Sequence, residues 1–106
     1  MSYSSPPNII STPNMTVSSF TGTTSATAGT AAPLSSTSLL VRGFIFYNTA
    51  ANNVTIQDSS GVQIVTIASG AASSPFYFGS ATVDLSKEIF TESAVASQSY
   101  TVVYWQ

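Results

Sequence analysis

Apolar residues in the second half of the chain follow the spacing of β-strands. In the segment 54–58 they alternate with polar residues, which predicts Val54 and Ile56 on the inward face and Gln57 on the outward face. The segment 39–48 is rich in branched and aromatic residues with apolar side chains on both faces, so we expect a strand that is at least partly covered on both sides. Similar residue types predict further strands at 62–67, 76–78, 82–85, 86–92 (with a helical turn as the alternative) and 99–105.

Turn signals separate these segments. The sequence Asp58-Ser59-Ser60-Gly61 predicts a hairpin, because Asp and Ser side chains bond to the backbone of a turn and Gly accepts positive φ. Turns recur roughly every 8–12 residues, a spacing typical of sandwiches and small barrels. We therefore expect an all-β fold of about six to eight strands, a small β-sandwich of jelly-roll or Ig-like type with an extended N-terminal arm.

The first 38 residues carry no charged side chain and contain four of the five prolines. Their Ser, Thr, Gly and Pro content favours neither a helix nor a packed core. We expect residues 1–38 to form the arm and residues 39–106 to form the sandwich domain, although 15–20 alternates enough for a short strand. Such an arm gains order by adding to the sheet edges of a partner, and a frayed tail is the alternative. The candidate partner-binding residues are its larger apolar ones: Ile9, Ile10, Met15, Val17 and Phe20.

Composition argues against an enzyme. The chain has no histidine and no cysteine, so it lacks the commonest general base and any thiolate ligand. Its many Ser and Thr hydroxyls would need an activating base, which a chain with a single Lys does not readily supply. Asp84, Glu88 and Glu92 recur every four residues, but we expect a solvated acidic face there and neither a metal site nor a catalytic pair. No cofactor is expected.

Charge narrows the choice of partners. Charged residues are 6% of the chain and only two are basic, which argues against binding to nucleic acid or to an anionic membrane. A surface this poor in charge discourages a free monomer, so we expect a homo-oligomer whose exterior is covered by other subunits. No signal peptide is evident, and we expect synthesis in a cytoplasm. The aromatic residues are expected in the core, with a sugar-binding face as the alternative.

A resemblance begins near Ser38 and covers roughly residues 38–106. A strand over 39–48 ends in Asn48-Thr49, and a small-residue turn, the strand Val54-Thr55-Ile56 and a Gly turn follow. The last strand, 99–104, ends in Val102-Val103-Tyr104. This order of strands and turns resembles the short β-sandwich proteins of bacteriophage virions. The stretch Lys87-Glu88-Ile89-Phe90 departs from it, because many such proteins have a Gly-Leu pair leading into the penultimate strand.

The resemblance implies a capsid decoration (cement) protein located on the virion surface. Such proteins often form trimers, bind the major capsid protein and use terminal arms for lattice contacts. It implies no catalytic or ligand residues. The alternative function is a phage fibre or spike domain that binds host surface glycans through the loops 50–53 and 73–78.

Overall fold

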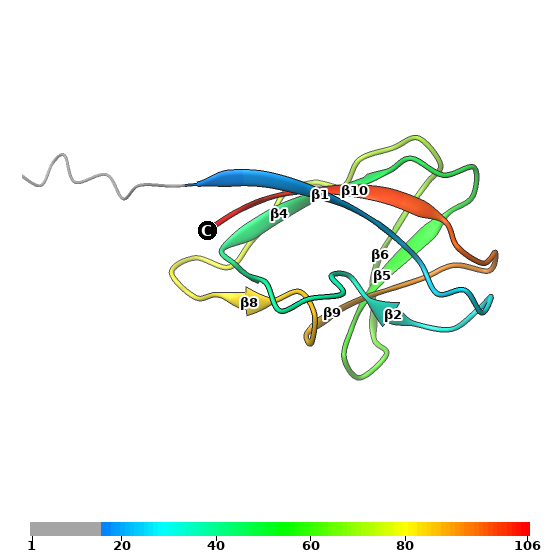
Figure 1. The fold of residues 1–106 in the computed structure, drawn as a ribbon, viewed down its shortest axis with the longest axis horizontal. Coiled ribbons are helices and arrows are strands. Elements are labelled where there is room, and N and C mark those ends of the chain that lie inside the picture. The colour runs from blue at the N-terminus through cyan, green and yellow to red at the C-terminus, as the bar shows by residue number, and fades with distance from the viewer. Residues whose placement is uncertain (1–15) are drawn as a thin grey trace, which may run out of the picture.

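Ten strands form two packed sheets and one short pair in residues 16–106, the part of the chain that the computed structural model describes (Figure 1). Sheet A has the order β1 (Val17–Thr23), β10 (Ser99–Trp105), β4 (Gly43–Asn48) and β7 (Phe76–Tyr77). Sheet B has the order β2 (Ala32–Pro33), β9 (Ile89–Glu92), β5 (Val54–Asp58) and β6 (Gln63–Ile67). The short pair joins β3 (Leu40–Val41) to β8 (Val83–Asp84). The predicted all-β sandwich is confirmed.

The strands pair in a nested order. β1 pairs with β10, β2 with β9, β3 with β8, β4 with β7 and β5 with β6, all antiparallel. The chain is therefore one long hairpin whose tip is the β5–β6 turn. The hairpin is rolled up, because β10 also pairs with β4 and β9 also pairs with β5. This is the topology of a jelly roll, so the structure decides between the two sandwich types that the sequence left open.

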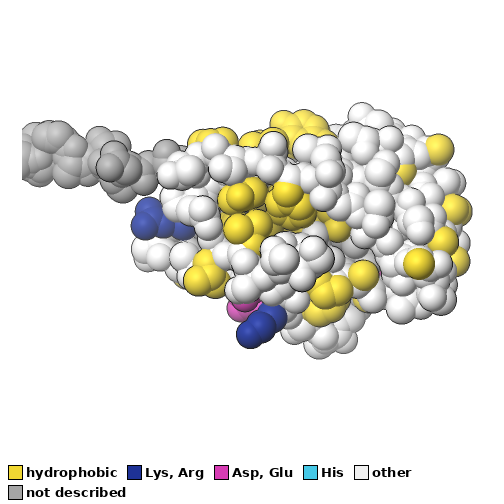
Figure 2. All heavy atoms as spheres, in the orientation of Figure 1, with side chains coloured by type: hydrophobic (Ala, Val, Ile, Leu, Met, Phe, Trp, Pro, Cys, Tyr) yellow, Lys and Arg dark blue, Asp and Glu magenta, His cyan; other side chains and the backbone are white. Residues whose placement is uncertain are grey.

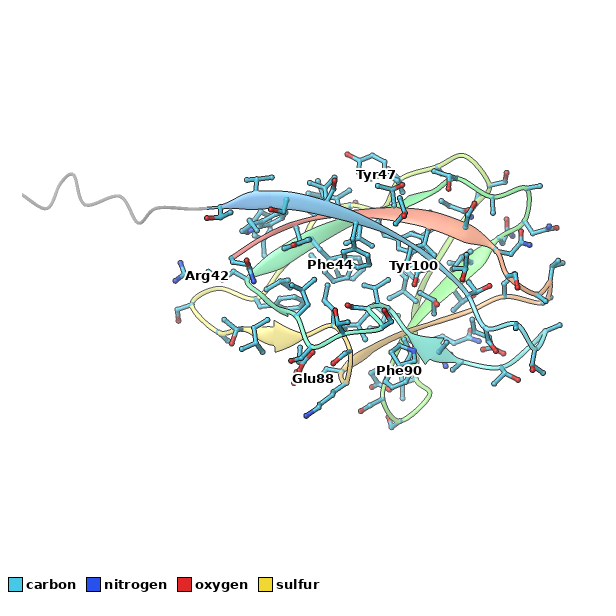
Figure 3. All side chains as sticks on the ribbon, viewed as in Figure 1. Arg42, Phe44, Tyr47, Glu88, Phe90 and Tyr100 are labelled. Carbon is cyan, nitrogen blue, oxygen red and sulfur yellow. The ribbon has the colours of Figure 1, made fainter. Side chains whose placement is uncertain are left out.

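The core lies between the two sheets. Phe44 and Tyr100 point into this space, whereas Tyr47 points away from it (Figure 3). Val54 and Ile56 are fully buried, as the alternation of β5 predicts. The other buried apolar residues are Leu34, Val41, Phe46, Ile67, Leu85, Ile89 and Val102. Aromatic residues pack closely here, and the rings of Phe44 and Phe76 stack with their centroids 4.6 Å apart.

Some strand predictions need correction. The segment 39–48 divides into β3 and β4, with Arg42 between them. Gln57 shares the outer face of sheet B with its pairing partner Phe90, as the alternation predicts, but it is buried there. In the segment 86–92, residues 86–88 lie in a turn and the strand begins at Ile89.

The hairpin prediction at the tip is confirmed. One carboxylate oxygen of Asp58 accepts hydrogen bonds of 2.9 Å from the backbone N–H groups of Ser60 and Val62. Gly61 has a φ of 91°, which a side chain would disfavour.

The sandwich begins well before residue 39. β1 pairs along its whole length with β10, and Leu34 is buried in the core. The predicted division into an arm of residues 1–38 and a domain of residues 39–106 therefore differs from the structure. Ser and Thr fill the outward and edge positions of a strand without cost, so a hydroxyl-rich segment is compatible with a place in the sheet. The predicted strand at 15–20 corresponds to β1.

Candidate interaction surfaces

The outer face of sheet A carries no charged strand residue, and apolar side chains cluster over part of it. Residues 100, 102 and 104 of β10 face inward, so Val103 and Trp105 face outward. Pairing places Val17 beside Trp105 and Ile45 beside Val103. Val17 is 61% exposed and Tyr77 is 73% exposed, and the Tyr77 and Trp105 rings lie 5.3 Å apart. We call the following side chains the sheet A patch: Val17, Ile45, Tyr47, Tyr77, Val103 and Trp105.

The outer face of sheet B is more polar. Thr55 pairs with Glu92 on one side and with Thr66 on the other, and the two threonine hydroxyls lie 3.1 Å apart. Two residues further along the same face, Phe90 of β9 pairs with Pro33 of β2, and both are apolar. β6 also exposes Ile64 and Val65, so sheet B presents polar and apolar side chains together.

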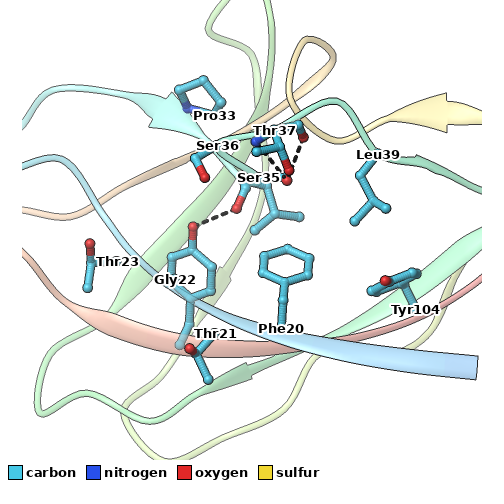
Figure 4. A pocket seen from close by; sticks show the side chains of 12 residues that line it. Phe20, Thr21, Gly22, Thr23, Pro33, Ser35, Ser36, Thr37, Leu39 and Tyr104 are labelled. Atoms are coloured by element: carbon cyan, nitrogen blue, oxygen red, sulfur yellow. Dashed lines mark hydrogen bonds between the residues drawn. The ribbon is translucent and has the colours of Figure 1, made fainter.

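A cavity of about 390 Å³ opens between β1 and the segment 33–39 (Figure 4). Phe20, Leu39 and Tyr104 form its apolar lining, and the rings of Phe20 and Tyr104 lie 5.9 Å apart. Ser36 and Thr37 contribute hydroxyl groups, and no charged residue lines the cavity. On the face shown in Figure 2, hydrophobic side chains gather in this groove between the layers and charged side chains occupy only two small places. The cavity suits an uncharged group with apolar surface.

The free edge of β1 runs along this cavity. The N–H of Gln106 donates to the carbonyl of Thr16, and the N–H of Thr24 donates to the carbonyl of Gln98. Because antiparallel bonding alternates, the even-numbered residues of β1 bond to β10. The backbone groups of residues 17, 19, 21 and 23 point to the other side, where β1 is the last strand of its sheet. Within residues 16–106, no strand pairs with that side.

A second, shallower hollow of about 580 Å³ lies against the polar face of sheet B. Amide, hydroxyl and carboxylate groups surround it, including those of Asn52, Asn53 and Glu92. Of the two loops predicted to carry glycan recognition, 50–53 contributes to this hollow. The loop 73–78 does not, because it leads into β7 in sheet A.

The acidic residues Asp84 and Glu92 lie in different surroundings. Asp84 accepts hydrogen bonds from the hydroxyls of Ser86 (2.7 Å) and Ser38 (2.9 Å) and from the N–H of Leu39 (3.1 Å). These bonds, the Ser86 hydroxyl first, hold the pKa of the Asp84 carboxyl well below its usual range. Asp84 therefore ties the start of β3 to β8, whereas Glu92 lines the hollow of sheet B.

Residues 16–106 contain no group of three His, Asp, Glu or Cys side chains placed to hold a metal ion. The same residues form no helix long and apolar enough to cross a bilayer. The hydroxyl of Tyr100 is buried, and this burial raises its pKa to about 12. It donates a hydrogen bond to a backbone carbonyl, which is a structural role.

The structure places two of the five predicted partner-binding residues. Val17 lies in the sheet A patch, whereas Phe20 faces inward and lines the cavity beside β1. Ile9, Ile10 and Met15 lie outside the described residues. Sequence reasoning did not find Tyr77 and Trp105 as surface residues, because it assigned the aromatic residues to the core. The signal was present in the alternation of 99–105, which puts Trp105 opposite to Tyr104.

Comparison of the chain with protein-family models, with curated proteins and with solved structures found no match.

Proposed function

We propose that this chain is a structural protein of a bacteriophage particle, a capsid decoration (cement) protein that binds and stabilises the lattice of the major capsid protein. The observation that carries the proposal is the sheet A patch. It is an uncharged outer face with Tyr77 73% exposed and Val17 61% exposed. Contiguous apolar surface of this kind marks sites that a partner covers.

The fold and the sequence resemblance support the same proposal. Jelly rolls occur widely in viral capsid proteins and also in lectins, so this support is an analogy at the level of fold. The order of strands and turns from residue 38 onward resembles that of small virion sandwiches. A chain without histidine or cysteine, in which Tyr100 and Asp84 are engaged in structural bonds, fits a role without catalysis or cofactor.

The protein would act by binding alone, without a chemical reaction. A ligand that binds only the assembled lattice stabilises it by mass action, in proportion to its concentration and affinity. Aromatic side chains at the centre of an interface contribute most of the binding energy, and Tyr77 and Trp105 are the candidates here. The protein would be made in the host cytoplasm and reside on the capsid surface. It would act as a homo-oligomer, with a trimer favoured by the resemblance.

Immunogold electron microscopy of the source virions tests this proposal. Label over the whole shell, with a copy number close to that of the major capsid protein, is the expected result. Label confined to the tail or to single vertices, or no label on the particle, would contradict it.

The alternative is a fibre or spike domain that binds host surface glycans. The hollow on sheet B favours it, because Asn52, Asn53 and Glu92 present donors and acceptors suited to sugar hydroxyls. Glycan-array binding by the purified protein, lost in the Asn53→Ala variant, would support this function. Absence of binding to any glycan together with shell-wide labelling would leave the decoration protein as the function.

A further inference from the structure

β1 has none of the sequence features that normally protect a sheet edge. Protected edges are short, or carry charges, prolines or bulges that prevent another strand from adding. β2 and β7 are two residues long, and Pro33 and Pro75 lie in or next to them. β1 has seven residues with regular pairing and contains neither a charged residue nor a proline. Its free edge is therefore a template for an added strand.

The cavity beside β1 gives this edge selectivity. When a peptide adds to a sheet edge, backbone bonds supply affinity and pockets for alternate side chains supply specificity. Here Phe20, Leu39 and Tyr104 receive an apolar side chain next to the open edge, and no charged residue lies there to pair with a charged one. The occupant should therefore be an extended, uncharged segment with an apolar residue.

Residues 1–15 of the chain have this chemistry. They carry no charged side chain, and they contain the adjacent pair Ile9-Ile10. In an extended strand, neighbouring side chains point to opposite faces, so one isoleucine faces the cavity in either register. A seven-residue edge needs about 23 Å of strand at about 3.3 Å per residue, which this segment can supply.

The point where the segment joins the fold favours exchange between copies. Residue 15 is followed directly by Thr16 and β1, so a segment folding onto its own β1 would have to reverse at once. The residues available for that reversal include Pro13-Asn14, and proline fixes φ near −65°, which suits a type I turn but excludes the two-residue I′ and II′ turns. The β1 edge of another copy can be reached without such a turn.

We propose that residues 1–15 of one copy add as a strand to the free edge of β1 in a second copy, with the side chain of Ile9 or Ile10 in the cavity between β1 and residues 33–39. The inference goes beyond the proposed function, since the arm exchange stands whether or not the oligomer binds a capsid.

Site-specific cross-linking is the direct test, because the chain has no cysteine of its own. Full-length Ile10→Cys and Ser36→Cys variants, distinguished by isotope label, are mixed and treated with a short thiol-reactive bifunctional reagent. Ser36 is exposed at the cavity, and Ser59→Cys in the distant β5–β6 turn is the matched control. The expected product is a covalent dimer joining residue 10 of one copy to residue 36 of the other, at least tenfold more abundant than the product with residue 59.

The double variant Ile10→Cys/Ser36→Cys completes the test. When this variant is treated with the same reagent in dilute solution, the cross-links should still join two different copies. Cross-links formed within one chain, or equal yields at residues 36 and 59, would overturn the proposal.

A second measurement uses self-association of the full chain. The Ile9→Asp/Ile10→Asp variant should raise the dissociation constant of the oligomer on the order of 100-fold, because it puts carboxylates against a cavity that has apolar side chains and no cation to pair with them. Ser2→Asp/Ser4→Asp adds the same charge at the start of the segment and should have little effect. An oligomer equally stable in both variants, or a wild-type protein that stays monomeric, would contradict the exchange. Shell labelling of virions is independent of either result, so failure here is distinguishable from failure of the proposed function.

Discussion

The hydroxyl of Tyr100 donates a hydrogen bond of 2.8 Å to the carbonyl oxygen of Leu34. Tyr100 belongs to β10 in sheet A, and Leu34 directly follows β2 in sheet B, so this bond connects the two sheets through the core. Both residues are almost fully buried, which leaves the carbonyl without access to water. Gly22 in β1 allows the close approach, since a Cβ there would lie 2.8 Å from the tyrosine hydroxyl.

Removing this hydroxyl should destabilise the fold without changing its shape. Tyr100→Phe leaves a buried carbonyl unsatisfied, which costs about 1–3 kcal/mol of the free energy of unfolding. Urea denaturation measures this, with Tyr77→Phe as the control because Tyr77 is exposed. Equal midpoints for the two variants would mean that the buried bond contributes nothing.

The same residue should make the fold sensitive to alkali. Burial raises the pKa of Tyr100 to about 12, above the ordinary value of 10.0, because the folded protein disfavours the phenolate. Its contribution to stability is complete below the unfolded pKa and declines as the pH rises from about 10 toward 12. Melting temperatures should fall over this interval in the wild type and fall less in Tyr100→Phe. Parallel declines in both proteins would show that other groups cause the effect.

Gly43 should not tolerate a side chain. A Cβ at this position would meet the ring of Trp105 and would lie 2.5 Å from the carbonyl oxygen of Phe76, a backbone atom of the neighbouring strand. Gly43→Ala is expected to lower the free energy of unfolding by roughly 1–3 kcal/mol, as overpacking does. Ser19→Ala, on the outer face of the same sheet, should stay within about 0.5 kcal/mol of the wild type in the same denaturation experiment. A Gly43→Ala protein as stable as that control would show that both the Trp105 ring and the Phe76 backbone shift without cost.

Replacing Asp84 should lower the melting temperature more near neutral pH than in acid. Hydrogen bonds from Ser86, Leu39 and Ser38 lower the pKa of its carboxyl below 3.8, so its stabilisation is present above about pH 4 and is lost as the pH falls through the folded value. Melting temperatures of the wild type and Asp84→Asn should therefore differ at pH 6 and converge toward about pH 2. A constant difference over this range would exclude the carboxylate charge as the cause.

Tyr77 should matter for particle binding and little for stability. Its side chain is 73% exposed on the sheet A patch, where it contacts Trp105. Under the proposed function, Tyr77→Ala should weaken binding to decoration-free particles by about 30-fold, the size expected of an aromatic residue at the centre of an interface. Thr66→Ala, on the outer face of sheet B, is the matched control in a co-sedimentation assay. Equal binding by both variants would place the lattice contact elsewhere.

Short-range patterns predicted the strands well but did not predict the sheet partners. The alternation in 54–58 placed Val54 and Ile56 correctly, because their burial depends only on the face that they occupy. Gln57 lies on the outer face as predicted, but its burial was not predicted, because burial on that face depends on neighbours that only the folded chain brings together. The segment 17–23 was assigned to the arm, although the alternation of 15–20 predicted a short strand, because nothing local indicates that β10 from the other end of the described chain pairs with it.

The same limit applies to the candidate surfaces. The scarcity of charge was evident in the sequence, but it indicated a covered exterior without saying which face is covered. Val17, Ile45 and Tyr77 come from three strands that are distant in the chain, so only the sheet order brings them together. The cavity beside β1 likewise depends on how the sheets pack at their open side.

The nested pairing also determines when the molecule can assume its shape during synthesis. β5 and β6 are close in sequence and can associate early, whereas β1 must wait for β10, the last of the ten strands in chain order. A nascent chain that lacks β10 therefore has no completed β1 edge. The pairing of Val17 with Trp105 forms only after β10 has been synthesised, so copies emerging side by side from one messenger cannot associate through a completed β1 edge before that point.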